Sequence, residues 1–542
     1  MLVALSARAQ YSDNNYQTNI IDGVTNIYQF GYTVGRPTNF GDVLIITNGG
    51  ALLTSGWCSI GSYEPSSSNN TVTVTGPGSV WNNSGTLDTD LVIGDLGPGN
   101  SLTIADGGAV FNGPGRIGYF LQDSKNNTVT VTGTGSVWSN RAGLYVGWVG
   151  VTNSLTIGPG GSVFATNVYV GSGHTGNKID VAGGTLYIAN SLGNHADLSV
   201  GYFGSGNALT ISNGGGVFNA FSYVGNLTSS DVNTVTLTDT GSVWASRNDL
   251  YVGYSGNSNA LTIGAGSSVL ASNVYVGFAS SSNKLDIIGG SLYATNALGN
   301  GLLEIRGGNL TFNDGTVTAD KLLLTNGSSS IIAFGGGTMH SKNTAVTNGQ
   351  QFVIGDGLGA ATYHLMGGVH SFGNSLSVRA NSYLTGCGTI NGLVVVDVGG
   401  TVLADCGGTL TFFKGTVTNN GIMRAINGST LEFYAKLVNN GTVDVINGST
   451  NFHLPFINNG TILDASSVVI SQTSVSGNDV IVKIQSVAGH TYQMQITPSL
   501  SPPTWADSGP AQAGTDGVLT FTDVGGATNQ PSRLYRIEVT AP

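Results

Sequence analysis

The chain has few charged side chains. Asp, Glu, Lys and Arg make up 9% of its 542 residues, against about 25% in an ordinary soluble domain. Hydrophobic residues make up 40%, so the low charge does not indicate disorder, which also requires low hydrophobicity. The formal net charge is −11, which argues against nucleic-acid binding, because that requires a basic stripe. We therefore expect no nucleic-acid partner.

Long apolar runs and helical patterns are also missing. No apolar run reaches the roughly 18 residues that a membrane-spanning helix requires, so the sequence predicts no transmembrane segment. We find no apolar pattern of period 3.6 that lasts for more than about two turns, which excludes a helical fold. Glycine is abundant, at 84 residues, but it lacks the three-residue period of collagen.

Cysteine is scarce, with three residues in the chain. Cys387 and Cys406 are 19 residues apart, close to one repeat in that region, so neighbouring repeats would bring their Cα atoms within disulfide range. A disulfide and two stacked, buried thiols both fit this spacing. Cys58 has no partner at such a spacing, and we expect it to pack as a small hydrophobic residue.

What the sequence has instead is a repeat. The segment that begins at Asn127 returns 106 residues later at Asn233. Within that long period, strand-like segments begin with asparagine at intervals of 24 to 30 residues, at Asn70, Asn100, Asn127, Asn153, Asn177, Asn207, Asn233, Asn259 and Asn283. Periods of this size indicate one supersecondary unit stacked on the next.

Each repeat holds three short apolar pieces separated by Gly, Asn, Asp and Ser, the residues of tight turns. The first piece alternates strictly, as in Thr71-Val72-Thr73-Val74-Thr75, which places aliphatic residues on one face and hydroxyls on the other. Strands this short bury a face only when they stack in parallel. The fold class predicted is therefore all-β: a three-sided parallel β-helix, or solenoid, right-handed because parallel crossover connections nearly always are.

The alternation predicts which side chains form the core. The aliphatic residues should be buried in columns: Val72, Val74, Leu102, Ile104, Val129, Val131, Leu155, Ile157, Leu209, Ile211, Leu261 and Ile263. The threonines between them should face solvent. A register slip of one residue would invert these two faces.

The pattern divides the chain into five segments. Residues 1–9 resemble the remnant of a signal peptide, with Ala7-Arg8-Ala9 as its cleavage site. We predict a cap and first coils over 10–69, regular solenoid repeats over 70–300, looser and then short-period coils over 301–465, and a small C-terminal β-sandwich over 466–542. In the short-period coils, asparagines at equivalent turns should stack their amides into a ladder.

The repeat resembles the type V secretion/PEP-CTERM-associated repeat of autotransporter-like exported bacterial proteins. The resemblance is carried by the phrases Leu250-Tyr251-Val252-Gly253, Ala260-Leu261-Thr262-Ile263 and Val274-Tyr275-Val276-Gly277. It covers roughly residues 40–460. It implies an extracellular β-helix of a Gram-negative-type bacterium, acting as a passenger at the cell surface and carrying no shared catalytic residues.

Parallel β-helices also include polysaccharide lyases and hydrolases, so this alternative needs a site. A lyase requires carboxylates for Ca²⁺ and a basic residue, and a hydrolase requires paired carboxylates. The acidic residues are scattered, and the pairs Lys178/Asp180 and Lys284/Asp286 are best interpreted as solvent-side ion pairs. We therefore predict no catalytic residue, no cofactor and no metal site.

Aromatic residues form the remaining candidate site. If the valine of each Val-Trp pair points inward, Trp81, Trp138 and Trp244 point outward and share a column with Phe111, Phe164, Tyr187, Phe218 and Tyr293. A second column would hold Tyr145, Tyr169, Tyr223, Tyr251 and Tyr275. These columns are either a platform for sugar rings or another protein, or structural stacks at the corners of the coil; the structural role is the simpler explanation.

Together these features predict a secreted or cell-surface, non-enzymatic β-solenoid with an adhesive or structural role. Its expected partners are extracellular glycans or matrix components. The alternative is a carbohydrate-binding or polysaccharide-degrading β-helix.

Overall fold

The computed structural model of the protein describes residues 14–83, 89–189, 196–528 and 532–540. Strands make up 55% of it and helices 1%, and the parallel strands form a β-solenoid of about 17 turns, as predicted. The chain divides into two compact units: residues 1–341 with 345–350, and residues 342–344 with 351–542. The signal-peptide remnant predicted for residues 1–9 lies outside the described residues.

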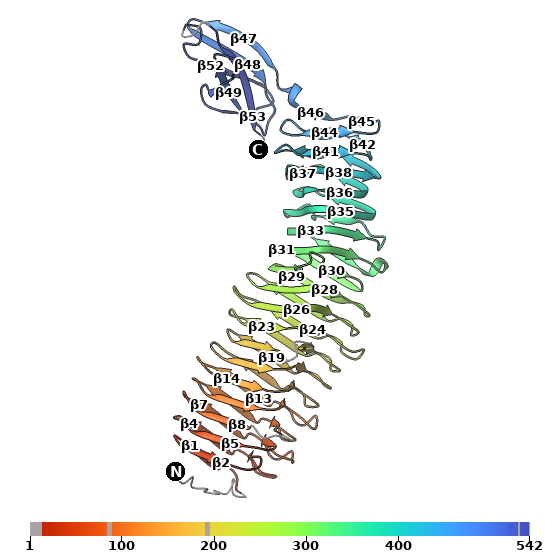
Figure 1. The fold of residues 1–542 in the computed structure, drawn as a ribbon. Helices are drawn as coiled ribbons and strands as arrows, with labels where there is room; N and C mark the ends of the chain where they lie inside the picture. Colours follow the sequence, from red (N-terminus) through yellow and green to blue (C-terminus); the bar gives the residue numbers. More distant parts are fainter. Residues whose placement is uncertain (1–13, 84–88, 190–195, 529–531, 541–542) are drawn as a thin grey trace. The chain divides into compact units, whose positions relative to one another are not determined.

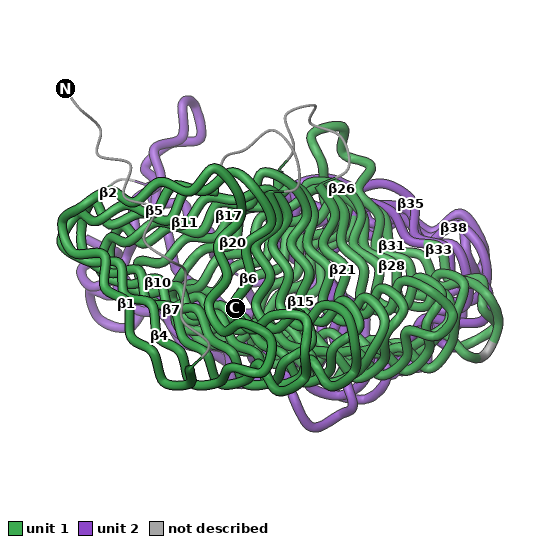
Figure 2. Tube along the Cα trace, turned by 90° about the horizontal axis from the view of Figure 1, so that it is seen from below, with its two compact units in different colours: residues 1–341, 345–350 green, residues 342–344, 351–542 purple. Residues whose placement is uncertain are grey.

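The first unit winds its strands onto three walls, which are visible along the coil axis in Figure 2 and from the side in Figure 1. The first wall consists of β1 (Thr18–Asp22), β4 (Val43–Thr47), β7 (Thr71–Thr75), β10 (Ser101–Ala105), β13 (Thr128–Thr132), β16 (Ser154–Ile157), β19 (Lys178–Ala182), β22 (Ala208–Ser212), β25 (Thr234–Leu237) and β27 (Ala260–Gly264). The second consists of β2 (Thr25–Ile27), β5 (Ala51–Thr54), β8 (Val80–Asn83), β11 (Ala109–Asn112), β14 (Val137–Asn140), β17 (Ser162–Ala165), β20 (Thr185–Ile188) and β23 (Gly216–Asn219). The third consists of β3 (Thr33–Val34), β6 (Cys58–Ile60), β9 (Leu91–Ile93), β12 (Gly115–Ile117), β15 (Leu144–Val146), β18 (Val168–Val170), β21 (Asp197–Val200) and β24 (Phe221–Val224).

Later coils of this unit replace turns by bends within continuous strands. These strands are β26 (Val243–Val252), β28 (Ser268–Val276), β29 (Asn283–Ala294), β30 (Leu302–Ile305), β31 (Gly308–Leu324) and β32 (Ile331–Phe334), with a short 3₁₀ helix η1 (Gly327–Ser329). The boundary between the units falls within β33 (Gly337–Val346). The coils already begin at Thr18, inside the segment predicted to hold the cap and first coils.

The register of the first wall is the predicted one. Val72, Leu102 and Val129 pair across adjacent coils, and all twelve predicted aliphatic residues are at most 1% exposed. The threonines between them, such as Thr73 and Thr103, lie on the outer face as predicted, but they are half-buried instead of exposed, because the strands above and below flank them. Burial of each such aliphatic side chain contributes about 1.5–3 kcal/mol.

A ladder of buried asparagines joins successive coils at the turn before the first wall. The amide nitrogen of each one donates to the Oδ1 atom of the next at 2.9–3.3 Å, and the backbone N–H donates to the same oxygen at 2.8–3.0 Å. The ladder consists of the nine residues that mark the sequence repeat: Asn70, Asn100, Asn127, Asn153, Asn177, Asn207, Asn233, Asn259 and Asn283. Each is at most 1% exposed, so the ladder satisfies buried polar groups that would otherwise be costly.

The ladder leaves no room for a side chain at the end of each third-wall strand. Gly147 has φ of +74°, and a Cβ atom added to it would lie 2.2 Å from Cγ of Asn177. The Val-Gly phrase that recurs in the sequence is therefore a steric requirement of the asparagine above it.

We predict that Gly147→Ala destabilises its coil more than Gly206→Ala does. Gly206 also has a positive φ, +62°, but no atom lies within 4 Å of the place that an added methyl group would take. Its substitution should therefore lower the free energy of unfolding only by the strain of an alanine in the left-handed conformation, about 1–2 kcal/mol. At Gly147 overpacking adds roughly 1–3 kcal/mol. Local hydrogen exchange over 144–182, together with the thermal unfolding midpoint, measures the difference. Equal losses in the two variants would mean that the ladder does not constrain the glycine.

The second unit contains coils of shorter period. They consist of β34 (Phe352–Ile354), β35 (Ala361–Val378), β36 (Ser382–Val396), β37 (Thr401–Ala404), β38 (Thr409–Lys414), β39 (Thr416–Asn419), β40 (Ile422–Ala425), β41 (Thr430–Phe433), β42 (Lys436–Asn439), β43 (Thr442–Asp444), β44 (Ser449–Phe452), β45 (Ile457–Asn458) and β46 (Thr461–Leu463), followed by the 3₁₀ helix η2 (Ala465–Ser467). The predicted amide ladder is present: the side chain of Asn419 donates to Asn439 at 2.8 Å, and Asn439 donates to Asn458 at 2.7 Å.

The three cysteines have two different environments. Cys387 and Cys406, in the second unit, form a disulfide with Cα atoms 6.0 Å apart. Cys58 is a buried free thiol, and burial raises its pKa to about 11. It packs as the predicted small hydrophobic residue.

The C-terminal segment forms a small β-sandwich, as predicted. One antiparallel sheet has the order β47 (Ile470–Ser476), β48 (Asp479–Gln485), β52 (Val518–Asp523), and the other groups β50 (Ala506–Asp507), β51 (Gln512–Ala513) and β53 (Leu534–Thr540) around β49 (Thr491–Thr497). Between them lies an apolar core of Val480, Val482, Ile484, Tyr492, Met494, Leu519 and Phe521.

Candidate functional site

The second wall of the first unit carries a column of outward-facing apolar side chains. Neighbouring coils align Phe164 with Tyr187 and Tyr187 with Phe218. Their rings stack at centroid distances of 5.1 and 5.3 Å, with interplanar angles of 11° and 16°. Phe111 and Leu270 occupy the same outward position in other coils, and all five side chains are 36–40% exposed.

The stacking of the rings determines whether a partner can reach their faces or only their edges. Rings that stack along the coil axis cover one another's faces, so their edges point to solvent. A sugar or an aromatic group binds best against a ring face. An uninterrupted column would therefore be a poor platform, and a face becomes available only where the column is broken.

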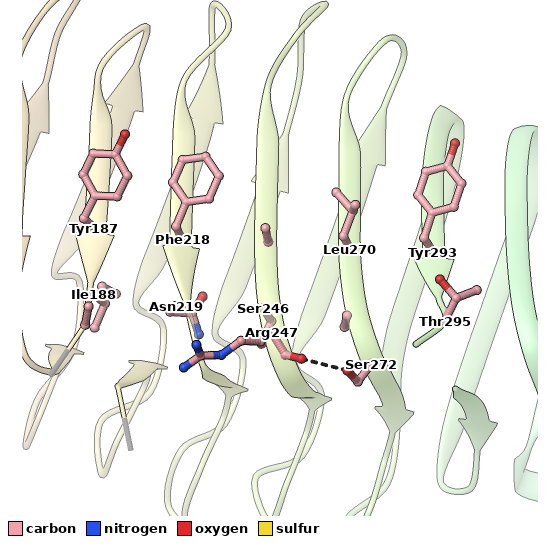
Figure 3. Close-up of a pocket in the computed structure, with 13 residues that line it drawn as sticks. Tyr187, Ile188, Phe218, Asn219, Ser246, Arg247, Leu270, Ser272, Tyr293 and Thr295 are labelled. Carbon is pink, nitrogen blue, oxygen red and sulfur yellow. Dashed lines mark hydrogen bonds between the residues drawn. The ribbon is translucent and has the colours of Figure 1, made fainter. Parts of the chain in front are cut away.

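The column is broken at Ala245. This residue pairs with Phe218 on one side and with Leu270 on the other, and its methyl group leaves a groove of about 440 Å³. Figure 3 shows the side chains of Tyr187 and Phe218 before the gap and those of Leu270 and Tyr293 after it. Two coil spacings of about 4.8 Å separate Phe218 from Leu270, and one flat ring with contacts of about 3.5–4 Å on each side fits that slot.

Polar groups lie at one end of the groove. Arg247 follows the gap on the same strand and is exposed, and its backbone carbonyl accepts a hydrogen bond from the Ser272 hydroxyl at 2.7 Å. Asn219 also lines this end (Figure 3). The groove thus offers an apolar slot beside the guanidinium of Arg247, and its thirteen described lining residues include no Asp or Glu.

The expectation that the tryptophans point outward is wrong. Trp81, Trp138 and Trp244 are fully buried, and each aligns with an inward valine of the adjacent coil, as Trp138 does with Val110. The outward positions in these coils belong to the residues after each tryptophan: Asn82, Ser139 and Ala245.

One additional turn residue causes this shift. Ala109 begins its strand five residues after Ile104, whereas the aligned Val137 comes six residues after Val131. Each residue of slip exchanges the two faces of a strand. Counting from the last aliphatic residue of the first wall would have revealed the shift, because the turn before each Val-Trp pair, which ends in Gly-Ser, is one residue longer than the turn before Ala109.

The indole N–H of each of these three tryptophans has a hydrogen-bond partner in the preceding coil. Trp138 donates to Oδ1 of Asn112 at 2.8 Å, Trp244 donates to Oδ1 of Asn219 at 2.9 Å, and Trp81 donates to the Thr54 hydroxyl at 3.3 Å. The tryptophans are therefore structural. The coils that contain them have a large side chain inside and a small one outside.

We predict that Trp244→Ala and Tyr187→Ala separate structural from exposed aromatics. Truncation of the buried Trp244 should cost about 3–5 kcal/mol and also orphan the buried Asn219 amide. Truncation of Tyr187, 40% exposed, should cost much less. Thermal and denaturant unfolding of the two variants measure this difference. Similar losses of stability would contradict the assignment.

The second predicted column lies on the third wall and is half-buried. Tyr145 stacks on Tyr169 at 5.2 Å, and Tyr251 stacks on Tyr275 at 4.9 Å. A second layer of rings meets them edge-on; for example, Tyr202 packs against Tyr169 at 71°. Burial raises the pKa of Tyr169 to about 12. Neighbouring rings therefore cover most of this column.

The two Lys–Asp pairs, for which the sequence predicts no catalytic role, form separate ion pairs. Lys178 and Asp180 form an ion pair at 3.0 Å, Lys284 and Asp286 form another at 2.8 Å, and both lysines are more than half exposed. These are the predicted solvent-side pairs. Among the described residues, no three His, Cys, Asp or Glu side chains gather in a group that could hold a metal ion.

Comparison with protein-family models and with curated proteins finds no match. In the described part of the chain, none of the helices has the length and hydropathy needed to cross a membrane.

Proposed function

We propose that this chain is a non-enzymatic, secreted or cell-surface β-solenoid with an adhesive or structural role, similar to an autotransporter passenger. The observation that carries the proposal is the groove at Ala245, where an exposed apolar column is interrupted by a slot one ring wide. An exposed apolar patch of this kind on a soluble protein is a typical interaction site.

Two features support an extracellular location. The disulfide between Cys387 and Cys406 is of a kind that persists in oxidising compartments and is rare in the cytosol. The solenoid has few charged residues and exposes Thr, Ser and Asn on its walls, so its solubility does not depend on surface charge. Expression into an oxidising and a reducing compartment, followed by thiol titration, tests this part of the proposal.

The chemistry of the groove supports a binding role over hydrolysis. Glycoside hydrolysis requires a pair of carboxyl groups on either side of the scissile bond, whereas the charged residue among the described residues that line this groove is Arg247. We expect no release of reducing or unsaturated ends from pectate, alginate or neutral polysaccharides, with or without Ca²⁺. Measurable turnover in a reducing-end or 235 nm absorbance assay would overturn the non-enzymatic proposal.

The slot also favours the carbohydrate-binding alternative, because a pyranose ring has the thickness and the apolar face that stack against Phe218. Its hydroxyl groups would reach Arg247. This second candidate differs from the first only in the partner that enters the slot.

We predict that Ala245→Phe abolishes adhesion while the fold remains intact. The new ring continues the stack between Phe218 and Leu270 and fills the slot, so stability should stay equal or rise slightly. Ser139→Phe is the matched control, because Ser139 occupies the equivalent position beside Phe111 and Phe164 and does not line the groove. Binding to insoluble glycans and to bacterial cell-wall preparations, measured by depletion from solution, should fall about tenfold or more for Ala245→Phe only. Equal binding by both variants would show that the groove is not the adhesive site.

A further inference from the structure

The residues that follow the glycine at the end of each third-wall strand form another column. Its members share a ladder of backbone hydrogen bonds, in which each N–H donates to the glycine carbonyl of the preceding coil at 2.9–3.3 Å. In several coils the residue at this position is aromatic: Tyr119, Trp148, Tyr202, Tyr254 and Phe278. In the coil that contains β9 it is Asp95, whose N–H donates to Gly61 in the same way.

The shorter side chain of Asp95 leaves a hollow of about 330 Å³ beside it. Its walls are Leu96 and four aromatic residues: Trp57, Tyr63, Tyr119 and Phe120. Tyr63 and Phe120 are about 60% exposed, so they form the rim. A second hollow of about 250 Å³, lined by Trp148 and Val149, shares the walls Tyr119 and Phe120.

The Asp95 carboxylate has no hydrogen-bond partner in the described part of the chain, although the residue is only 2% exposed. Arg116 is the cation that faces it, and Arg116 is paired with Asp90 at 2.7 Å. Tyr63 and Tyr119 are the other titratable groups around it. Burial, opposed in part by Arg116, raises the pKa of Asp95 to about 6. A buried, unpaired carboxylate destabilises a fold, so packing does not account for an aspartate here.

We propose that this hollow binds a neutral sugar ring, with Asp95 accepting hydrogen bonds from its hydroxyl groups and the aromatic walls contacting its apolar face. Such a ligand supplies the hydrogen-bond donors that the carboxylate lacks and the CH groups that stack on rings. The two hollows that share Tyr119 and Phe120 match consecutive rings of one oligosaccharide. This site is separate from the groove at Ala245, and its proposal does not depend on that one.

An organic cation is the other ligand that aromatic walls and a carboxylate attract. Here the guanidinium of Arg116 lies 4.4 Å from the centroid of the Tyr119 ring. It therefore already occupies a face of this ring, and its positive charge lies within electrostatic reach of Asp95. A second cation would meet repulsion from Arg116, whereas a neutral hydroxylated ring would not.

The test uses the full chain and measures binding by isothermal titration calorimetry and tryptophan fluorescence. The probes are cellohexaose, chitohexaose, mannohexaose and isomaltohexaose, with tetramethylammonium chloride as the cation. We expect at least one hexasaccharide to bind, and Asp95→Asn and Phe120→Ala each to weaken it by about tenfold. Two matched controls should bind as the unsubstituted chain does. Phe203→Ala removes the equivalent ring of a later coil, 52% exposed, and Asp123→Asn changes a carboxylate that is 69% exposed.

The pH dependence provides a second readout. The ionised carboxylate is the stronger acceptor, so affinity should be highest above pH 6 and should fall as the pH drops through about 6. Because the folded-state pKa is raised, the ionised Asp95 destabilises the fold above that pH and ceases to do so as it protonates. Asp95→Asn should therefore raise the melting temperature at pH 7.5, and this gain should shrink toward pH 4.

Each contrary result overturns the proposal. Binding of tetramethylammonium that displaces the sugar would assign the hollow to a cation. Sugar binding that survives both Asp95→Asn and Phe120→Ala would place the ligand elsewhere. Failure of all four hexasaccharides to bind at millimolar concentration would mean that the hollow is not a sugar site.

Discussion

The fold depends on the vertical stacking of identical positions. Parallel strands of successive coils are spaced by about 4.8 Å, so every side chain meets the equivalent side chain of the next coil. In the core, aliphatic side chains pack against the equivalent side chains of the next coil. At the turn, each asparagine donates an amide N–H to the asparagine of the next coil and accepts one from the asparagine of the preceding coil. The nine-residue ladder fixes the height of each coil and, through contact with the glycine below, the shape of the preceding turn. A solenoid of this kind is specified position by position, because each coil contacts only its neighbours.

Stacking also links the inside of a coil to its outside. On the second wall, coils in which the strand begins four or five residues after the last aliphatic residue of the first wall place a valine or leucine inside and a ring outside. Coils in which it begins six residues later place a tryptophan inside and a residue without a ring outside. The interior tolerates the large indole because the preceding coil supplies an amide or hydroxyl for its N–H. The exchange therefore has a surface consequence: wherever a tryptophan enters the core, the column of rings outside is interrupted.

The sequence predicts the fold well because alternation and period are local signals. The burial of Val72, Leu102 and Ile157 follows from alternation within a few residues, and the amide ladder of Asn419, Asn439 and Asn458 follows from their regular spacing. The orientation of Trp138 does not, because it depends on the length of the turn that precedes it. The groove at Ala245 was missed for a related reason: a gap is defined by the larger residues in the coils before and after it. The sequence around Asp95 does not mark it as a binding residue. Its role is suggested only by the structure, in which Tyr119 and Trp148 occupy the equivalent position of the next coils.

Interruptions in a column are thus the places where a repetitive surface becomes specific. A continuous column of rings presents the same edge in every coil, so it cannot distinguish one partner from another. Removing one ring exposes the faces of its neighbours and creates a space one or two coils high, whose depth is set by the residue that replaces it. Alanine at 245 gives an apolar floor with a guanidinium nearby, and aspartate at 95 gives a charged floor that lacks a hydrogen-bond donor. The two proposed sites differ in chemistry because the replacing residues differ, while the scaffold that holds them is the same stack of coils. A solenoid can in this way carry several unrelated binding sites without any change of fold, and the residues that depart from the repeat are the ones that determine what it binds.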